Sequence, residues 1–539
     1  MCGIFAYAGS SVDKKTLEKA FNKIKHRGPD ASASFKMKTV YLGFHRLALM
    51  DQTAAGMQPF RNREKWLLCN GEIYNHNNLR QKLSNKYASS MLSTSSDCAV
   101  IIPAIEHYGL ETACQVLDGE FAFVIYDEKT QTLRAARDPL GIRPLFYGLT
   151  EQSGEIAFAS EAKALSDFCQ EVKPFPIGSY FDGKQFHRYH QHEFEARHHQ
   201  TSDIMAVPQT SEEAARHICS LLEDAVKKRL EADAPLGFLL SGGLDSSLVC
   251  ALAAARSTTP IKTFAIGIEG DAIDTRYARD VAEFIGSDHT EVIFTKKQVR
   301  ECLPKVIKSI ESYDITTVRA SVGMYLICEY IRSHTPIKAL LTGEVSDELF
   351  GYKYTDFAPD ANSFQVESIK RVTELFYYDV LRADRCLAAH SLEARVPFSD
   401  QKFVDYVLSI PPELKMNHHG IGKYLLRLAF QGKGLLPDHI LMREKAAFSD
   451  AVGHSMVDEL KAFAEVCVSN EELATANVLF SHSSPISKES YLYRQIFENH
   501  YKNMEKLIPG FWLPNQSWEN CKVDDPSARV LPNYGLSGT

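Results

Sequence analysis

The sequence predicts a multidomain α/β protein in which an α+β layered domain precedes a doubly wound parallel α/β sheet. Its 539 residues exceed the size of roughly 250–300 residues at which one hydrophobic core stops growing, so two or three domains are expected. The first third alternates short strands with turns and a few helices. From about residue 210 onward, continuous apolar strands alternate with helices, which is typical of a parallel sheet covered on both faces.

The elements of the first third are short strands punctuated by helices. Strands are expected at residues 4–8, 40–49, 66–69, 121–126 and 145–147. Asn70-Gly71 follows the third strand as a turn signal. The clearest helix covers residues 13–25, where one apolar stripe recurs at helical spacing through Leu17, Ala20, Phe21 and Ile24.

The domain boundary is expected at a polar, His-rich segment without periodicity, residues 190–209. Such a run is more often a solvated linker than a metal site, although its histidines also allow a metal-binding interpretation. Thr210 and Glu213 then form a capping-box pattern that predicts a helix to about residue 230. The expected organisation is a first domain (1–190), a linker (191–209), a second domain (210–515) and a mobile C-terminal tail (516–539).

Composition favours an enzyme that acts on small molecules. A net charge of −8 gives no electrostatic reason to expect nucleic acid or anionic membrane as a partner. No apolar run approaches the ~18 residues that span a bilayer, and the N-terminus lacks a signal-peptide layout, so the protein is expected in the cytosol. The twelve cysteines show no CxxC or metal-ligand spacing, and only Cys2 stands out by position.

A phosphate-binding loop is predicted within the parallel sheet, whose strands are expected at 236–240, 261–267 and 337–342. After the first strand comes SGGLDSS, residues 241–247, whose glycines allow close backbone approach and whose serines begin a helix with free N–H groups. Asp245 in this loop would repel phosphate unless a divalent cation lies between them, which indicates Mg²⁺. The loop lacks the GxxxxGK[ST] pattern for β–γ cleavage, and ligands should bind at the carboxyl edge of the sheet.

Cys2 is a candidate nucleophile because removal of Met1 would make it the first residue. Its own α-amine, with a pKa of roughly 7.7–8, could then take the proton of a thiol whose pKa is about 8.5. A cysteine at the second position is not by itself evidence of catalysis, so its role has to be judged from the surrounding motifs.

Six motifs follow one another through residues 1–190: MCGIF, HRGPD (26–30), HRLAL (45–49), NGEIYN (70–75), SSD (95–97) and RDPLGIRPLFYG (137–148). Together they resemble class II glutamine amidotransferases, which implies an αββα sandwich of the N-terminal nucleophile (Ntn) hydrolase type. By this resemblance Cys2 attacks the glutamine amide, and Asn70 with the Gly71 N–H stabilises the oxyanion. Arg46 and Asp97 would hold the glutamine carboxylate and amine. The rest of the implied pocket is Leu47, Ala48, Leu49, Met50 and Glu72.

The second half of the chain decides among families that share such a first domain, which include phosphoribosyl-pyrophosphate and sugar-phosphate amidotransferases. SGGLDSS matches the PP-loop of ATP pyrophosphatases, which release pyrophosphate and leave AMP on the substrate. Four motifs follow in order: ESYDITTVRAS (311–321), LLTGEVSDELFG (340–351), LEARVPFSD (392–400) and REKAAFSDAVG (443–453). Nearly the whole chain therefore resembles glutamine-hydrolysing asparagine synthetases of the bacterial and plant type, with an adenine nucleotide α-hydrolase-like second domain.

That resemblance implies amidation of aspartate through β-aspartyl-AMP, with ATP, Mg²⁺, ammonia from glutamine, and a homodimeric protein. The implied ATP-binding residues are Leu239, Ile266, Thr342 and Gly343 at the adenosine and Ser241, Gly242, Gly243, Asp245 and Ser246 at the phosphates. Asp245 and Asp347 would coordinate Mg²⁺. Arg319 and Lys445 would neutralise the departing pyrophosphate, and Glu344 would take a proton from ammonia. Outside this context the cations would be assigned to solvated surface charges, and Glu344 to a helix cap.

The chain departs from three of the family's usual patterns. GEGSDE has Val345 at its middle glycine, FGGY is shortened to residues 350–352, and VPFLD has Ser399 at its apolar position. A β-branched residue at position 345 would strain the loop if φ is positive there and would merely add bulk if φ is negative.

Two alternative functions stay open. In relatives like β-lactam synthetase, an internal amine closes the adenylated carboxylate; intact Cys2 argues against this, because such enzymes need no ammonia. A catalytically silent relative used for binding or regulation is the second alternative, and the retained charged residues argue against it.

Overall fold

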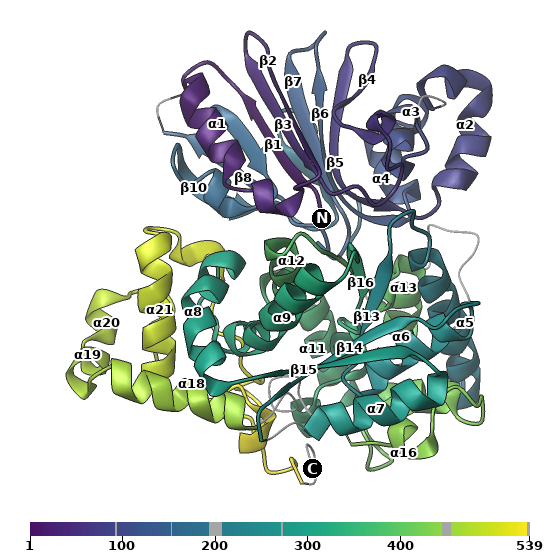
Figure 1. Ribbon diagram of the computed structural model, residues 1–539, viewed down its shortest axis with the longest axis vertical. Helices are drawn as coiled ribbons and strands as arrows, with labels where there is room; N and C mark the ends of the chain where they lie inside the picture. The colour runs from purple at the N-terminus through teal and green to yellow at the C-terminus, as the bar shows by residue number, and fades with distance from the viewer. Residues whose placement is uncertain (92–93, 152, 193–206, 271–272, 445–453, 536–539) are drawn as a thin grey trace.

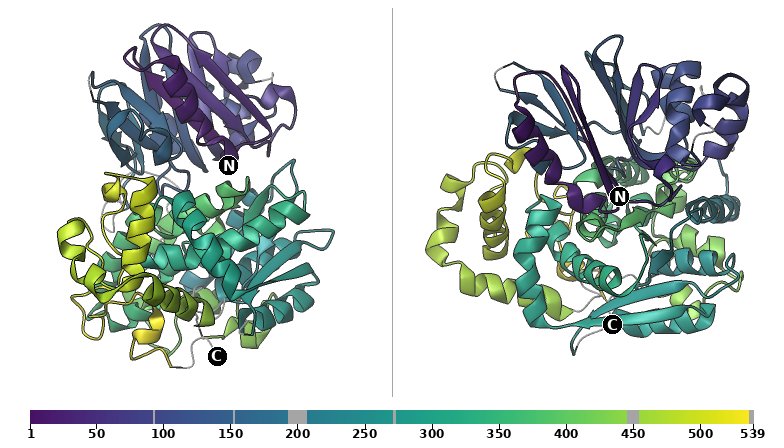
Figure 2. Two further views of the ribbon diagram at one scale, coloured as in Figure 1. Left: turned by 60° about the vertical axis from the view of Figure 1, so that its left-hand side comes forward. Right: turned by 45° about the horizontal axis from the view of Figure 1, so that its top comes forward.

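The computed structural model consists of two stacked bodies, with the N-terminal one above the larger C-terminal one in Figure 1. It describes residues 1–539 except 92–93, 152, 193–206, 271–272, 445–453 and 536–539. The N-terminus lies at the junction of the two bodies in every view (Figures 1 and 2). No helix of the described part of the chain is both long and apolar enough to cross a bilayer.

The N-terminal body contains two antiparallel six-stranded sheets. The first has the order β10 (Cys169–Pro174), β8 (Phe146–Thr150), β9 (Ile156–Ala159), β1 (Gly3–Ala8), β3 (Val40–Arg46), β2 (Ala31–Lys36). The second has the order β12 (Phe186–Arg188), β11 (Ser179–Phe181), β7 (Thr132–Arg137), β6 (Gly119–Asp127), β5 (Lys65–Ile73), β4 (Phe60–Asn62).

The side-chain period of β1 explains why both faces of its sheet are covered. Ile4 and Ala6 face the second sheet in one apolar cluster, while Phe5 and Tyr7 pack with α1 (Lys14–Asn22) in another. The outer face of the second sheet is covered by α2 (His76–Met91), α3 (Ile101–Tyr108) and α4 (Leu110–Val116). This confirms the predicted layered domain and its αββα order.

The structure corrects one local expectation. Asn70-Gly71 is not a turn, because β5 continues through it and pairs with Ala122 and Phe121 of β6. Gly71 has nearly extended backbone, and a Cβ there would lie 2.3 Å from the carbonyl oxygen of Glu120. Glycine is therefore needed for close strand pairing rather than for reversal of the chain.

The C-terminal body confirms the predicted parallel sheet. Its strand order is β15 (Asp288–Phe294), β14 (Lys262–Ile268), β13 (Leu236–Leu239), β16 (Ala339–Leu341), β17 (Glu393–Arg395), and all four neighbouring pairs are parallel. The helix predicted after Thr210 is α5 (Ser211–Arg229), whose first turn is capped by the Thr210 side chain. The helix after the first strand, α6 (Leu244–Ala254), begins two residues earlier than expected.

The remaining helices surround this sheet and extend beyond it (Figure 1). They are α7 (Ile273–Ile285), α8 (Lys296–Ile310), α9 (Ile315–His334), α10 (Ser346–Phe350), α11 (Ala361–Glu374), α12 (Asp379–Ala389), α13 (Gln401–Ser409), α14 (Pro412–Lys415), α15 (Tyr424–Phe430), α16 (Asp438–Leu441), α18 (His454–Cys467), α19 (Asn470–Ala474), α20 (Ala476–Leu479) and α21 (Lys488–His500).

The described part of the C-terminal segment is packed, which corrects the expectation of a mobile tail. Trp518, Cys521 and Leu531 are buried in an apolar cluster with Tyr354 and Trp512. The polar composition of the segment hid these few apolar anchors, each of which fills space between helices rather than forming a periodic pattern.

Buried ion pairs join the two bodies. Arg27 is bidentate to Asp384, with N–O distances of 2.8 and 2.9 Å, and also pairs with Glu161. Separating the bodies would leave such charges without partners in partly apolar surroundings, which is strongly unfavourable. Ser399 lies in a second cluster, where its hydroxyl is 3.2 Å from Glu120 and 3.3 Å from Arg229. The unusual serine of VPFSD therefore adds a polar contact at the junction.

Candidate active sites

Cys2 lies where the first sandwich meets the second body. Its thiol is 3.5 Å from the backbone nitrogen and 3.6 Å from the backbone oxygen of Leu47, in the loop that follows β3. Leu47 and Leu49 pack with Ala234 and Ala339 of the second body, and Cys2 contacts this cluster. The loop after β3 thus shapes the thiol site and contacts the amino end of β16 at the same time.

The environment of Cys2 keeps its thiol protonated. Burial raises the pKa of Cys2 to about 11. With Met1 in place the Cys2 nitrogen belongs to a peptide bond, and the free amine is that of Met1, which donates to Leu392 O at 3.3 Å. Burial lowers the pKa of this amine to about 6. A thiol in these surroundings needs a base to become nucleophilic, and a Cys2 amine exists only once Met1 has been removed.

The side-chain amide of Asn70, in β5, is a candidate hydrogen-bond donor for the substrate. The side chain is fully buried, and neither amide atom has a hydrogen-bond partner among the residues that the structure describes. Leaving a buried amide unsatisfied costs about 1–3 kcal/mol, and a bound ligand that forms the missing hydrogen bonds would remove this cost. Its Nδ2 can donate to a developing oxyanion, as the sequence predicted.

The predicted glutamine-binding residues divide between the pocket loop and the junction. Arg46 donates to the carbonyl oxygens of Met50, Asp51 and Thr53, so its guanidinium holds the loop that includes residues 47–50. The backbone N–H of Ala48 donates to Asp30 Oδ2 at 2.8 Å, which fixes the same loop. The structure therefore shows Arg46 positioning the loop rather than presenting all its donors to a ligand.

The two predicted carboxylates both lie at the carboxyl end of β5. Asp97 is buried and accepts a 2.6 Å hydrogen bond from the backbone nitrogen of Ile73, and burial raises its pKa. Glu72 pairs at 3.0 Å with Arg395 of β17, and burial raises its pKa as well. Glu72 thus connects the thiol site to the second body, where the sequence had placed it only in the pocket wall.

A pocket opens at the carboxyl edge of the parallel sheet, where ligand binding was expected. It is lined by Leu239, Ser241, Gly243, Asp245, Ser246, Ile266, Thr342, Gly343, Glu344 and Asp347 among others. Phe264, Met324 and Ile327 add apolar lining of the kind that a flat purine would require. Gly242 is the one predicted ATP residue that does not line the pocket.

The Gly-Ser loop has the geometry of an anion cradle. Gly242 has a φ of +72°, and a Cβ there would lie 2.5 Å from the backbone nitrogen of Ala278. This glycine therefore lets the loop turn tightly against α7. The hydroxyls of Ser241 and Ser246 lie 2.9 Å apart across the loop, at the N-terminus of α6, where unpaired N–H groups favour phosphate.

Two predicted metal ligands converge on a lysine that the sequence analysis did not single out. Lys423 Nζ lies 2.6 Å from Asp245 Oδ2 and 2.6 Å from Asp347 Oδ1, and it is 3.0 Å from Ser346 Oγ. These carboxylates raise the pKa of the buried ammonium despite its desolvation. The only local signal was its place after the glycines of residues 420–422 and before the apolar helix α15.

Glu344 presents an open carboxylate oxygen to the same pocket. One oxygen is 3.6 Å from Arg382 Nη2, and the other, Oε2, is buried without a hydrogen-bond partner in the described part of the chain. A buried acceptor of this kind suits a proton acceptor for an incoming amine. Arg382 was missed because a lone arginine in a helical pattern gives no sign of facing a ligand.

Arg319 is placed differently from the expectation. It is buried and grips Glu489 at 2.8 and 2.6 Å and Asp525 at 2.7 Å. It does not line the pocket, so the structure makes it a structural anchor between α9, α21 and the C-terminal segment. Lys445, the other predicted pyrophosphate cation, lies outside the described residues. Arg427 and Arg443 line the pocket instead, and the latter donates to Gly242 O at 3.1 Å.

Val345 has a backbone conformation that is rare for a β-branched residue. Its φ is +79° and its ψ is −21°, and the side chain is only 1% exposed. Of the two sequence-based possibilities, the strained one is observed, at a cost on the order of 1–3 kcal/mol. The residue directly links Glu344 to α10, which carries Asp347.

A half-buried thiol at the edge of an αββα sandwich, joined to a parallel sheet with an anion-binding loop, defines a glutamine amidotransferase coupled to an ATP-using synthetase domain. Residues 1–215 match the family described as "Glutamine amidotransferase domain". Residues 217–370 and 356–527 match the family described as "Asparagine synthase". The chain therefore belongs to the asparagine synthase family.

Whole-length relatives agree with this assignment. The chain is 42% identical to "Asparagine synthetase [glutamine-hydrolyzing]" of Cricetulus griseus and 41% identical to that of Homo sapiens, over 99% of each chain in both cases. It is 39% identical to "Probable asparagine synthetase [glutamine-hydrolyzing]" of Acanthamoeba polyphaga mimivirus, over 99% of this chain and 100% of that one. The finer expectation of a bacterial and plant type stays a prediction.

Proposed function

We propose that this enzyme makes asparagine from aspartate and ATP with ammonia released from glutamine, yielding glutamate, AMP and pyrophosphate. The observation that carries the proposal is the match of both catalytic domains, in one chain and over its full length, to glutamine-hydrolysing asparagine synthetases. Two chemical features support the proposal: the pocket at the carboxyl edge of the sheet, and the buried Asn70 amide, which has no hydrogen-bond partner among the described residues.

In the first domain, the Cys2 amine takes the thiol proton and the thiolate attacks the glutamine amide carbonyl. The Asn70 amide and the Gly71 N–H stabilise the resulting oxyanion, and ammonia leaves. Water then releases glutamate from the thioester. Asp97 is suited to pair with the substrate ammonium, because its carboxylate is already fixed by the Ile73 N–H.

In the second domain, the β-carboxylate of aspartate attacks the α-phosphorus of ATP and pyrophosphate departs. The N–H groups at the start of α6 and the ammonium of Lys423 offset the negative charge that develops on the phosphates. Ammonia then attacks the β-aspartyl-AMP carbonyl, Glu344 accepts a proton, and AMP leaves with the electron pair of the broken bond.

The donor set near the loop fits the implied Mg²⁺. Oxygens of Asp245 and Asp347 both point at the position of the Lys423 ammonium, so they can face one hard cation. When bound, Mg²⁺ would neutralise phosphate charge. Cytosolic residence and homodimer formation remain predictions from the sequence.

One strand connects the two centres. The loop beside Cys2 packs on Ala339 at the start of β16, and Glu344 follows the end of that strand. β16 has three residues, so the five residue steps from Ala339 to Glu344 span at most roughly 17 Å, which sets an upper scale for the path of ammonia. We propose that ammonia passes inside the junction, where bulk water cannot protonate it.

The test is a stoichiometry. Protein with Met1 removed, as verified by mass, is incubated with glutamine, aspartate, Mg²⁺ and ATP, and asparagine, AMP and pyrophosphate are quantified together. Equal yields are expected, and Cys2→Ala should abolish the glutamine-driven reaction while sparing the reaction driven by ammonium chloride. Formation of glutamate without AMP would contradict aspartate as the acceptor. Exchange of labelled pyrophosphate into ATP is measured in parallel, and its absence would indicate a relative without catalytic activity.

A further inference from the structure

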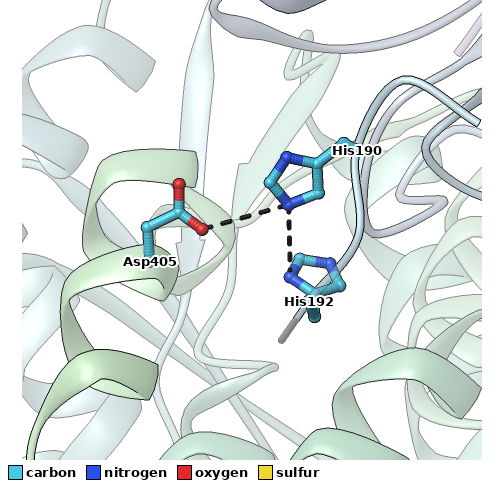
Figure 3. Close-up of side chains that lie close together, drawn as sticks. All are labelled: His190, His192 and Asp405. Atoms are coloured by element: carbon cyan, nitrogen blue, oxygen red, sulfur yellow. Dashed lines mark hydrogen bonds and ion pairs between the residues drawn. The ribbon is translucent and has the colours of Figure 1, made fainter. Parts of the chain in front are cut away.

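A second cluster of metal-ligating side chains lies at the junction, away from both catalytic centres. His190 and His192 follow β12 at the end of the first body, and Asp405 projects from α13 of the second. Figure 3 shows the two imidazoles and the carboxylate directed toward one another. We call these three residues the His-His-Asp cluster. They were expected to begin a solvated linker, but His192 is only 6% exposed.

The spacing of the ligand atoms matches that of a small divalent ion. His190 Nε2 lies 3.4 Å from His192 Nδ1 and 3.9 Å from Asp405 Oδ1, and all three atoms lie within 4.8 Å of one another. Tetrahedral zinc with bonds of about 2.0–2.2 Å places its ligand atoms roughly 3.3–3.6 Å apart. The imidazole pair already has this separation, and Asp405 Oδ1, on a side chain that is 34% exposed, lies 3.9 Å from His190 Nε2, a few tenths of an ångström beyond it.

A hydrogen bond to the backbone fixes which nitrogen of His192 faces the cluster. His192 Nε2 lies 3.1 Å from the carbonyl oxygen of Pro139, an arrangement that requires the proton on Nε2. The lone pair of Nδ1 is then directed at the cluster. An imidazole held by a backbone carbonyl on its far nitrogen is the usual support of a metal ligand.

Gln401 provides the corresponding support for the carboxylate. Its amide nitrogen donates to Asp405 Oδ1 at 2.8 Å and lies 3.2 Å from His190 Nε2. Three atoms that can each bind a cation therefore face one point, and the hydrogen bonds to Pro139 O and from Gln401 hold the imidazole of His192 and the carboxylate in place there.

We propose that the His-His-Asp cluster is a zinc-type site that ties the two bodies together. Two imidazoles and one carboxylate are the ligand set of borderline divalent cations such as Zn²⁺, not of Mg²⁺. A metal held by ligands from both bodies stabilises their docked arrangement, because it binds only while they are docked. The site is separate from the proposed synthetase chemistry and needs no substrate.

The test uses the full chain, stripped with a chelator and titrated with zinc chloride alone in competition with a chromophoric chelator. Three variants are compared with the unchanged protein: His192→Ala, the isosteric Asp405→Asn, and His439→Ala as the matched control. His439 forms an ordinary exposed pair with Asp280 at 3.2 Å, so it reports adventitious binding by a surface His-Asp pair. Thermal unfolding with and without zinc is measured in parallel.

One zinc per chain is expected for the unchanged protein and for His439→Ala. The two cluster variants should raise the dissociation constant of that zinc at least about tenfold, since loss of even an outer-shell partner weakens metal binding by 10–100-fold. Zinc should raise the melting temperature of the unchanged protein but not of Asp405→Asn. Equal zinc affinity in all four proteins would overturn the proposal and assign the cluster to hydrogen bonding alone. If His192→Ala fails to fold, the zinc affinity of Asp405→Asn relative to that of the unchanged protein tests the proposal.

Discussion

The positive φ of Val345 can be tested by comparing two substitutions at the same position. Val345→Ala keeps a Cβ and therefore keeps much of the backbone strain, whereas Val345→Gly removes it. At an ordinary helical position the order is reversed, because glycine loses both burial and backbone rigidity. Val322, fully buried within α9, provides that ordinary control through Val322→Ala and Val322→Gly.

The magnitudes follow from additive estimates. At Val322, glycine loses one more buried carbon than alanine, worth about 0.8 kcal/mol, and about 1 kcal/mol of helix propensity, so its variant should be roughly 1.8 kcal/mol less stable. At Val345 the same carbon and about 0.5–1 kcal/mol of backbone entropy oppose a strain relief of about 1–2 kcal/mol. The two Val345 variants should therefore lie within about 1 kcal/mol of each other.

The assay is thermal or urea unfolding of the four variants at one protein concentration without ligands. A difference of 1.8 kcal/mol corresponds to several degrees in the melting temperature of a domain of this size. The reasoning is refuted if the alanine-to-glycine gap at Val345 is as large as the gap at Val322, because that result would mean that alanine carries no strain there.

Three further outcomes are expected. Lys423→Met should lower asparagine synthesis at least 100-fold, the order of magnitude for losing one charge-stabilising group, and leave glutamine hydrolysis unchanged; unaltered synthesis would remove it from the phosphate site. Arg319→Met should cost about 3–5 kcal/mol of unfolding free energy, because Glu489 stays buried with its charge uncompensated, and turnover per folded molecule should persist. Burial lowers the pKa of His45 to about 4, so the unfolded chain binds its proton first and stability should fall as pH drops from about 6.5 toward 4. His45→Gln should flatten that slope, and an unchanged slope would contradict the assignment.

The layered fold and the parallel sheet could be predicted from the sequence because their signals are local. Period-two alternation places Ile4 and Phe5 on opposite faces of one strand, and a capping residue at Thr210 starts α5. The same is true of the Gly-Ser loop, since strand, glycines and helix N-terminus are consecutive. Asn70-Gly71 shows the limit, because the dipeptide favours a turn until the partner strand pairs through it.

The ordered motifs alone also determined the family and the chemistry proposed for Cys2 and Glu344. What only the tertiary structure decided is which charges meet. Lys423 reaches Asp245 across 178 residues, and Asp525 returns across 206 residues to hold Arg319 away from the pocket. Local periodicity encodes the face on which a side chain lies. It does not encode which distant carboxylate shares that space, because the partner of a buried charge is chosen by the packing of whole elements.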